Sequence, residues 1–569
     1  MPRNLALKFE ILIIVILAFV PLFIHLPYRV NIFLSWEGAY RISQGQLPFR
    51  DFGLPLGGVY WMVPALFFKL FGPGLFTLVK AQVFINIVAG LAFRSILLSL
   101  GVDSRIRLAA VVLFALSYSF FNFWPWYNHT VIVYELVALA FLFRGLRVQW
   151  ADADGRSEHT GKGYSWLWIA GAAGFTICSF LTKQDGGGMA FFIEAMILLV
   201  NGILWRRWQA LIVFVSGSAV FALLLILPYL PYGFWYWFNH GQPPHTARVS
   251  TFDIASEFFG SSLWIKFYIF LTVFLAVIRW RNLAALKADP KGVMMVVLTI
   301  GILGEAAVLQ VTSYTPPDNN IFFHSFAFPC ILGLLAGWLP AGWERRGVTL
   351  VLVCGVLLWW SGVWWKYTQR LTGPFLSRLS PVSPTGENVV NRDTYMIDPD
   401  SPRRYKEIPT EQWVDCGLPV FKGITMPAPT AEGIHRLLAS RPVVTYRQQR
   451  KAGVAGDFRV LNMSELTPLA AEIPFTPERN PDLPLWYHLG VGMFNRQAGI
   501  FETRIREHYY DLVLFEFIPT LNNFYPFRVR DSLLLHYPLV DSFPAPRRGV
   551  ETQGIIEVYA RPAGSGSSY

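Results

Sequence analysis

The chain has 569 residues, of which 53% are hydrophobic, 16% aromatic and only 15% charged, and its mean hydropathy is +0.40. So few charged side chains could not cover the surface of a soluble protein of this length, which indicates a polytopic membrane protein. The formal net charge of +11 does not indicate nucleic-acid binding, because the lysines and arginines follow the pattern of membrane topology described below, and no nucleic-acid partner is expected.

Apolar runs long enough to cross a bilayer recur through the first two thirds of the chain. A spanning helix needs about 20 such residues, which predicts about eleven spans. The first run follows Arg3 and Lys8 but has no small-residue cleavage site, so it is interpreted as an uncleaved helix. The runs cover residues 10–28, 74–98, 106–122, 128–148, 165–182, 188–204, 208–232, 262–279, 292–309, 321–342 and 347–365.

The positions of the lysines and arginines predict the orientation, because cationic loops stay in the cytoplasm. An N-terminus inside the cell places every cationic cluster between spans on the cytoplasmic side, and an odd number of spans then sends the chain after Trp365 outside. The loop over residues 30–73 lies outside too. The cytoplasmic cations are Arg105, Arg107, Arg144, Arg147, Arg206, Arg207, Arg279, Arg281, Lys287, Lys291, Arg345 and Arg346.

Residues 366–562 have the composition of a soluble domain, rich in proline, arginine and acidic residues. Short apolar segments at 442–446, 511–517 and 554–559 predict strands, and residues 430–440 and 496–508 predict helices. We therefore expect a membrane domain over residues 1–365 and an extracytoplasmic α/β domain over 366–562, followed by a flexible tail at 563–569. Three of the four cysteines lie in spans and Cys416 stands alone outside, so no disulfide or thiolate metal site is expected.

The first outer loop, residues 30–73, is long and partly apolar, which predicts short interfacial helices. One is expected over residues 59–70, where Tyr60 and Trp61 suit the headgroup belt. The loop also holds two carboxylates. Glu37 is either an interfacial acid paired with Arg41 four residues on, or a functional group, and Asp51 is the second acid.

The order of residues in this loop resembles the first outer loop of the C-type glycosyltransferases that use polyprenyl-phosphate sugars. The nearest groups are the protein O-mannosyltransferases and the lipid A aminoarabinose transferases. The segments that carry the resemblance are Glu37-Gly38-Ala39-Tyr40, Gly45-Gln46-Leu47-Pro48-Phe49-Arg50-Asp51-Phe52, and Pro55-Leu56-Gly57 before Tyr60.

Two later segments extend the resemblance over roughly the first 365 residues. Leu181-Thr182-Lys183-Gln184, at the outer end of the fifth span, is similar to the Thr-Lys motif that this family places near the lipid phosphate. Residues 320–329, NIFFHSFAFP, are similar to its late motif, with His324 at the centre. The motifs occur in the family's order and on the expected side of the membrane, and their succession carries the resemblance.

The resemblance implies an integral-membrane inverting glycosyltransferase at the outer face of a bacterial inner membrane. It would move a sugar from a polyprenyl-phosphate carrier to a hydroxyl of a glycan, lipid or protein acceptor, with a carboxylate base and cations that neutralise the leaving phosphate. The family usually has aspartate, its expected base, where this chain has Trp36. Glu37 is favoured in that role. Asp51 is the alternative, and loss of activity is a third possibility.

Lys183 is assigned to the donor phosphate, because it follows a span on the outer side and precedes a glycine stretch, residues 186–188, that we interpret as flexible. The alternative is a lysine that snorkels from a helix end. Arg50 and Arg248 are weaker cation candidates, each more typical of a solvated loop charge. Two further residues of the same motifs are assigned to substrate binding, Tyr40 and Gln184.

Asn128, His129 and His324 lie at the outer ends of spans. The histidines could bind an acceptor sugar or complete a metal site with the two loop carboxylates, or they could be structural. Glu305 lies within a span, where a carboxylate is functional or paired. No Asp-x-Asp or His-rich spacing is present, and neither a metal nor another cofactor is expected.

Two other functions remain open from the sequence. A lipid-linked glycan transporter or flippase needs polar groups near the membrane midplane, and the sequence offers mainly Glu305. A catalytically inactive relative that acts as a scaffold is the other, because Trp36 replaces the usual aspartate.

Overall fold

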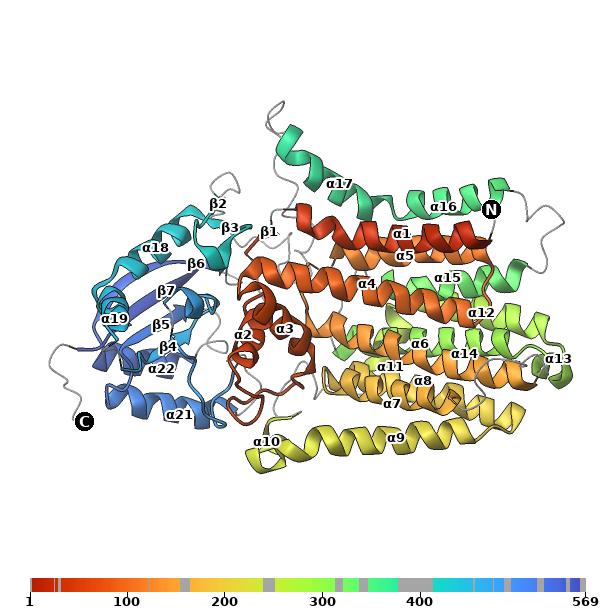
Figure 1. The fold of residues 1–569 in the computed structure, drawn as a ribbon, viewed down its shortest axis with the longest axis horizontal. Helices are drawn as coiled ribbons and strands as arrows, with labels where there is room; N and C mark the ends of the chain where they lie inside the picture. The colour runs from red at the N-terminus through yellow and green to blue at the C-terminus, as the bar shows by residue number, and fades with distance from the viewer. Residues whose placement is uncertain are drawn as a thin grey trace.

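The computed structural model has an elongated helical bundle at one end and a smaller α/β domain at the other (Figure 1). The structure describes residues 3–24, 26–28, 32–121, 123–153, 164–238, 251–312, 321–336, 346–376, 413–453, 456–473, 475–485, 493–518, 526–548 and 553–562. The two parts meet around the first outer loop. This arrangement is an α-helical multi-span membrane protein with a C-terminal mixed α/β domain, as the sequence predicted.

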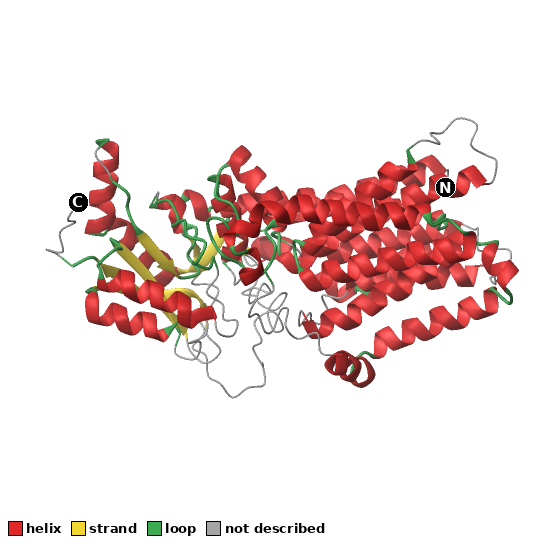
Figure 2. Ribbon diagram, turned by 90° about the horizontal axis from the view of Figure 1, so that it is seen from below, coloured by secondary structure: helices red, strands yellow, loops and turns green. Residues whose placement is uncertain are grey.

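The helices of the bundle lie side by side along its long axis (Figures 1 and 2). Four of the described helices, α4, α8, α9 with η3, and α14, have the length and hydropathy to cross a membrane, or up to five if α11 and α12 form one span bent by 83°. The predicted count of about eleven spans stays a prediction. The bounds are α1 (Arg3–Phe19), α4 (Leu75–Ser99), α5 (Ser104–Phe121), α6 (Tyr127–Ala153), α7 (Ser165–Phe180), α8 (Gln184–Trp205), α9 (Gln209–Ile226), η3 (Leu227–Tyr232), α10 (Phe234–Trp237), α11 (Thr251–Gly260), α12 (Leu263–Arg279), α13 (Leu283–Lys287), α14 (Pro290–Thr312), α15 (Ile321–Ala336), α16 (Arg346–Trp359) and α17 (Ser361–Leu376).

The first apolar run ends earlier than the expected residue 28. Helix α1 stops at Phe19 and continues as the 3-10 helix η1 (Val20–Phe23), in which Pro21 occupies an early position where its missing N–H is not needed. Strand β1 (Leu26–Pro27) then pairs in parallel with β3 (Ile424–Pro427) of the C-terminal domain. The backbone directly after the first membrane helix is therefore part of a sheet with the C-terminal domain, on the same side of the bundle.

The first outer loop folds into helices, as predicted. Helix α2 (Ile32–Ser43) is followed by η2 (Val59–Trp61) and α3 (Met62–Phe71), which cover the predicted helix at 59–70. Gly38 lets α2 pack closely, since a Cβ there would lie 2.0 Å from the Trp61 ring. The Trp61 indole N–H donates to the Leu34 carbonyl at 3.0 Å. These contacts fix helix α2 against η2 within the loop.

The C-terminal domain contains a four-stranded sheet in the order β4-β5-β7-β6 and a three-stranded sheet in the order β1-β3-β2. Strand β5 is apolar almost throughout, because it is buried at the centre of its sheet, parallel to β4 and antiparallel to β7. The remaining elements are β2 (Trp413–Asp415), η7 (Pro419–Phe421), α18 (Ala428–Ala439), α19 (Arg441–Lys451), β4 (Val460–Met463), α20 (Leu469–Glu472), α21 (Met493–Arg506), β5 (Leu512–Phe517), α22 (Phe527–His536), β6 (Leu539–Arg548) and β7 (Gln553–Ala560).

Most of the elements expected in this domain are present. The strands predicted at 511–517 and 554–559 are β5 and β7, and the helices predicted at 430–440 and 496–508 are α18 and α21. The strand predicted at 442–446 is wrong, since these residues lie in α19. Pro442 lies in the first turn of α19, where proline is tolerated. Val443 is the buried residue of this helix. The packing of that face therefore outweighed the preference of the β-branched residues for a strand.

The predicted domain boundary at residue 366 falls inside α17. The first described element after α17 is β2, and residues 377–412 lie outside the described part of the chain. The predicted flexible tail at 563–569 lies outside it as well.

Cysteine labelling tests the orientation of the bundle. Cys416 is unsuitable, because it is only 2% exposed and burial, together with Asp415 and Glu472, raises the pKa of its thiol to about 12. We expect Glu432→Cys, on the exposed face of α18, to react with a membrane-impermeant maleimide in cells whose inner membrane is intact. The matched Lys287→Cys, on α13 at the other end of the bundle, should react only after that membrane is opened. The reverse order of labelling would contradict the orientation.

Candidate functional site

The first outer loop lies directly on the turn between α7 and α8. The Gln184 side-chain amide donates to the Pro55 carbonyl at 2.7 Å, across 129 residues of sequence. The Val59 N–H donates to the Leu181 carbonyl at 3.4 Å. A Cβ on Gly57 would lie 1.4 Å from the Leu181 oxygen, so only glycine fits. Two of the segments singled out in the sequence, 55–57 and 181–184, are thus in contact.

Lys183 stands at this junction, at the N-cap of α8, and is 1% exposed. Its ammonium lies 2.7 Å from Asp185 Oδ2, and that carboxylate also accepts hydrogen bonds from the Thr312 hydroxyl at 2.6 Å and the Gly186 N–H at 2.7 Å. An acid in the first turn of a helix is favoured by the helix dipole. Lys183 is therefore held in a buried ion pair and is not the snorkelling lysine that the sequence left open.

The glycines that follow Lys183 were interpreted as a flexible stretch, which is wrong. Residues 186–188 form the first turn of α8. A Cβ on Gly187 would lie 2.2 Å from the backbone of Phe180, and one on Gly186 would lie 2.8 Å from Val131. These two glycines allow α8 to pack tightly against α7 and α6.

Carboxylates continue the polar region deeper into the bundle. Glu135 on α6 and Glu305 on α14 are both buried, and their side chains are near enough to influence each other electrostatically. Glu194 on α8 is fully buried and accepts a hydrogen bond from the Thr176 hydroxyl. The sequence analysis named only Glu305. A search for single acids inside the apolar runs would have found the other two as well, because ionisable groups in membrane helices are rare.

Glu37 lies away from this region, on the side of α2 that faces the C-terminal domain. Its carboxylate forms an ion pair with Arg41 at 2.9 Å, which is the pairing considered from the sequence. Arg41 also donates to the Glu478 carbonyl at 2.9 Å. Burial raises the pKa of Glu37, and Arg41 opposes this shift. The adjacent cavity has a volume of about 40 Å³, which holds a water molecule and not a sugar.

Asp51 and Arg50 hold the turn that follows α2. Asp51 Oδ2 accepts hydrogen bonds from Arg50 at 2.6 Å and from the Leu47 N–H at 2.7 Å, and its carbonyl accepts the Asn480 N–H at 2.8 Å. Burial acts to raise the pKa of Asp51, but the hydrogen bonds from Arg50 and Leu47 outweigh it and lower the pKa. The contacts of both side chains are local to the loop.

Trp36 and Tyr40 are packing residues in this structure. The Trp36 indole N–H donates to the Pro73 carbonyl at 2.6 Å, and its ring stacks on Tyr40 at 4.5 Å between centroids. The Tyr40 hydroxyl donates to the Ala470 carbonyl of the C-terminal domain at 3.5 Å. Trp36, which stands where the family has aspartate, is fully buried between α3 and the loop.

The remaining predicted residues lie on membrane helices. Asn128 and His129 are in the first turn of α6. His324 on α15 forms a hydrogen bond with the Tyr268 hydroxyl at 3.0 Å, and its ring packs at a tilt against Trp264 of α12. In the described part of the chain, no three His, Cys, Asp or Glu side chains are arranged to hold a metal ion. Arg248 lies outside the described residues.

No family model and no curated protein matches this chain. Two solved structures resemble it over its length. ArnT from Cupriavidus metallidurans bound to undecaprenyl phosphate has 12% identity, a TM-score of 0.45 and coverage of 99% of both chains. The same protein in the apo state has 12% identity, a TM-score of 0.44 and coverage of 100% of both chains. ArnT is a lipid A aminoarabinose transferase, one of the groups that the sequence motifs resemble. At this identity and TM-score, the likeness carries no argument about the chemistry of this chain.

The packing of α8 can be tested with two adjacent glycines. We expect Gly187→Ala to lower the melting temperature of the purified protein, because its methyl group would overlap the Phe180 backbone and overpacking of this kind typically costs about 1–3 kcal/mol. Gly188→Ala is the matched control, since nothing lies within 4 Å of the position of its Cβ. Equal melting temperatures for the two variants would show that α8 does not pack as described.

Proposed function

We propose that this protein is an integral-membrane inverting glycosyltransferase. It would transfer a sugar from a polyprenyl-phosphate carrier to a hydroxyl group of a glycan, lipid or protein at the outer face of a bacterial inner membrane. The observation that carries the proposal is the contact between residues 55–57 and the turn at 181–184, with Lys183 at the junction. Two motifs that resemble those of lipid-phosphate glycosyltransferases are thus in contact, which supports a common site.

The transfer needs few protein groups. The acceptor oxygen forms a bond to the anomeric carbon while the bond from that carbon to the phosphate oxygen breaks, and the phosphate keeps the electron pair. The acceptor proton passes to a carboxylate. Lys183 would neutralise the leaving phosphate, and its ammonium has three N–H donors, so it can bind a phosphate oxygen while it keeps Asp185 as a partner.

Glu37 is the proposed base, with Asp51 as the alternative. Burial raises the pKa of Glu37 above that of an ordinary carboxyl, which brings it closer to the range in which general bases work. The pKa of Asp51 is lowered, and a weaker base of this kind suits a structural role. Because the cavity beside Glu37 has only about 40 Å³ and Glu37 lies away from Lys183, the proposal requires the C-terminal domain to move away from α2 and the Glu37 carboxylate to approach the Lys183 junction when the substrates bind.

A lipid-linked glycan transporter or flippase is the second candidate. The buried carboxylates Glu135, Glu194 and Glu305 favour it, because polar groups inside the bundle are expected of a transport path. The two functions differ in what happens to the donor. Purified protein with a radiolabelled polyprenyl-phosphate sugar and an acceptor should release free polyprenyl phosphate if it is a transferase. Movement of intact lipid-linked sugar across proteoliposomes without such release would support the transporter.

Donor binding tests the role of Lys183. Lys183→Ala and Asp185→Asn each break the same buried ion pair, so both should lower the melting temperature. Only Lys183→Ala removes the phosphate ligand, and loss of a charge-assisted hydrogen bond should weaken donor binding by about 10- to 100-fold. Binding that falls equally in the two variants would assign Lys183 to structure alone.

Turnover tests the role of Glu37. Glu37→Gln should reduce kcat by about 10²- to 10⁴-fold if the carboxylate is the base, with donor binding largely retained. Arg41→Gln breaks the same ion pair but keeps the carboxylate, so it should retain most of the activity. Loss of turnover in Asp51→Asn, with full activity in Glu37→Gln, would reverse the assignment of the two acids.

The pH dependence of kcat gives an independent test of Glu37 as the base. A base works only when it is ionised, so kcat should fall as the pH decreases through the pKa of Glu37, which burial places above its ordinary value. Arg41 lowers this pKa, and Arg41→Gln should therefore move the acidic limb of the profile to higher pH. If the acidic limb of the kcat profile stays at the same pH in Arg41→Gln, a group other than Glu37 controls that limb.

A further inference from the structure

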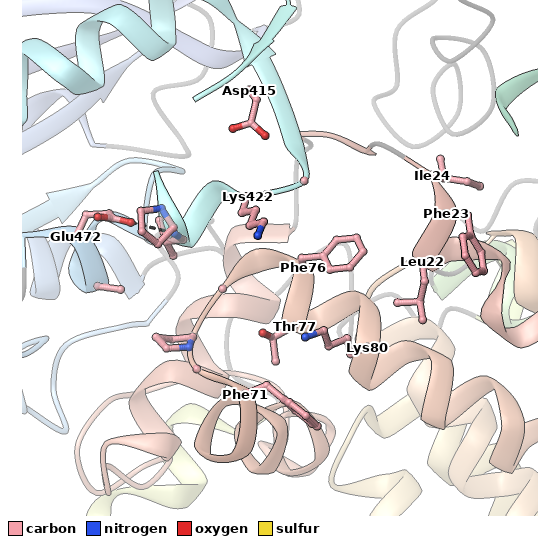
Figure 3. Close-up of a pocket in the computed structure, with 17 residues that line it drawn as sticks. Leu22, Phe23, Ile24, Phe71, Phe76, Thr77, Lys80, Asp415, Lys422 and Glu472 are labelled. Atoms are coloured by element: carbon pink, nitrogen blue, oxygen red, sulfur yellow. Dashed lines mark hydrogen bonds between the residues drawn. The ribbon is translucent and has the colours of Figure 1, made fainter. Parts of the chain in front are cut away.

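A cavity of about 950 Å³ lies where the bundle meets the C-terminal domain. Its walls come from η1 after the first membrane helix, from the turn between α3 and α4, and from the turn between η7 and β3 (Figure 3). Its lining shares no residue with the Lys183 junction or with the small cavity beside Glu37, although Pro73 on its wall accepts a hydrogen bond from Trp36. A volume of this size is at the upper end of the range for sites that enclose small molecules.

Two lysines reach the cavity from different parts of the protein. Lys80 extends from α4 and Lys422 from the turn before β3, and their ammonium groups point into the same space (Figure 3). Thr77 lies one helical turn before Lys80 and presents its hydroxyl beside it. The turn at Lys422 is fixed by Gly423, whose φ of 78° lies in the left-handed region.

The acids on the cavity wall accept hydrogen bonds from backbone N–H groups. Asp415 accepts the Gly417 N–H at 2.8 Å, and Glu472 accepts the Val420 N–H at 2.9 Å. Among the described residues, neither Lys80 nor Lys422 forms a salt bridge. The Lys80 ammonium lies over the Phe71 ring, 5.0 Å from the ring centroid. The lining thus carries two ammonium groups and two carboxylates, and because the described residues show no ion pair between these lysines and acids, a phosphate can bind between the two ammonium groups.

The mouth of the cavity is apolar. Phe23 and Phe71 line it and are 73% and 57% exposed, as expected for side chains in contact with lipid. Lys80 is five residues after the start of α4 at Leu75, about 7.5 Å along the helix axis, which allows its ammonium to reach the headgroup level. The cavity therefore combines two ammonium groups with an entrance at the edge of the bilayer.

We infer that this cavity binds the phosphate headgroup of an anionic membrane lipid. Lys80, Lys422 and Thr77 contact the phosphate, and the acyl chains leave past Phe23 and Phe71. Because Lys80 belongs to a membrane helix and Lys422 to the C-terminal domain, the bound lipid joins the two parts of the protein. This inference is independent of the proposed transfer, since neither lysine belongs to the motif segments.

Lipid binding to the full-length protein tests the inference. The probes are phosphatidylglycerol and phosphatidylcholine of the same acyl composition, added to detergent-purified protein and followed by native mass spectrometry and by melting temperature. We expect phosphatidylglycerol to bind and to raise the melting temperature, and phosphatidylcholine to have little effect. Inorganic phosphate at the same concentration should have little effect too, because it lacks the chains that contact the apolar mouth.

Variants that remove the charge of one cavity lysine test where the lipid binds. Lys80→Gln and Lys422→Gln should each weaken phosphatidylglycerol binding by about fivefold, and the double variant should combine the two losses. Lys69→Gln is the matched control, because Lys69 is an exposed lysine on α3 that does not line the cavity. Equal binding of the two lipids by the parent protein would overturn the inference, as would a double variant that binds like Lys69→Gln. A response to inorganic phosphate equal to that of the lipid would also overturn it and would indicate a site for a soluble anion.

Discussion

The close contact of the first outer loop with the α7–α8 turn is the constraint on which the candidate site depends. Gly57 approaches the Leu181 carbonyl so closely that no side chain fits, and the Pro55 carbonyl is satisfied by Gln184. Irregular backbone near the membrane must have its polar groups satisfied within the protein, because lipid offers no partners. These contacts supply such partners, and they bring the loop over Lys183.

Polar groups in the helices behind the loop must likewise find partners within the protein. Gly186 and Gly187 allow α8 to approach α6 and α7, and the resulting tight packing buries Lys183 completely. A buried ammonium needs a partner, and Asp185, fixed by Thr312, provides it. The ion pair and the deeper carboxylates therefore form a polar region inside the bundle.

Helix α2 connects this membrane region to the C-terminal domain. Trp36 packs against the bundle side of the loop, whereas Arg41 and Tyr40 contact the C-terminal domain through backbone carbonyls. Strand β1 adds a direct backbone link, because it pairs with β3 immediately after the first helix. Glu37 is thus enclosed by an interface between two parts of the protein, and access to its carboxylate depends on how those parts separate.

The sequence by itself determined the membrane class, the two-part organisation and several elements whose pattern is local. Strands β5 and β7 and helices α18 and α21 were predicted because their apolar periodicity reflects burial on fixed faces. The succession of motifs also singled out the segments 55–57 and 181–184, which the structure shows in contact. Packing decided the rest. Residues 442–446 have strand-forming side chains but form a helix, and Gly186 and Gly187 look flexible in sequence but are needed for close helix contacts. The contact of Arg41 with the C-terminal domain, the proximity of Glu135 to Glu305 and the cavity that Lys80 and Lys422 share all join segments far apart in the chain. Local sequence does not encode which distant surfaces meet.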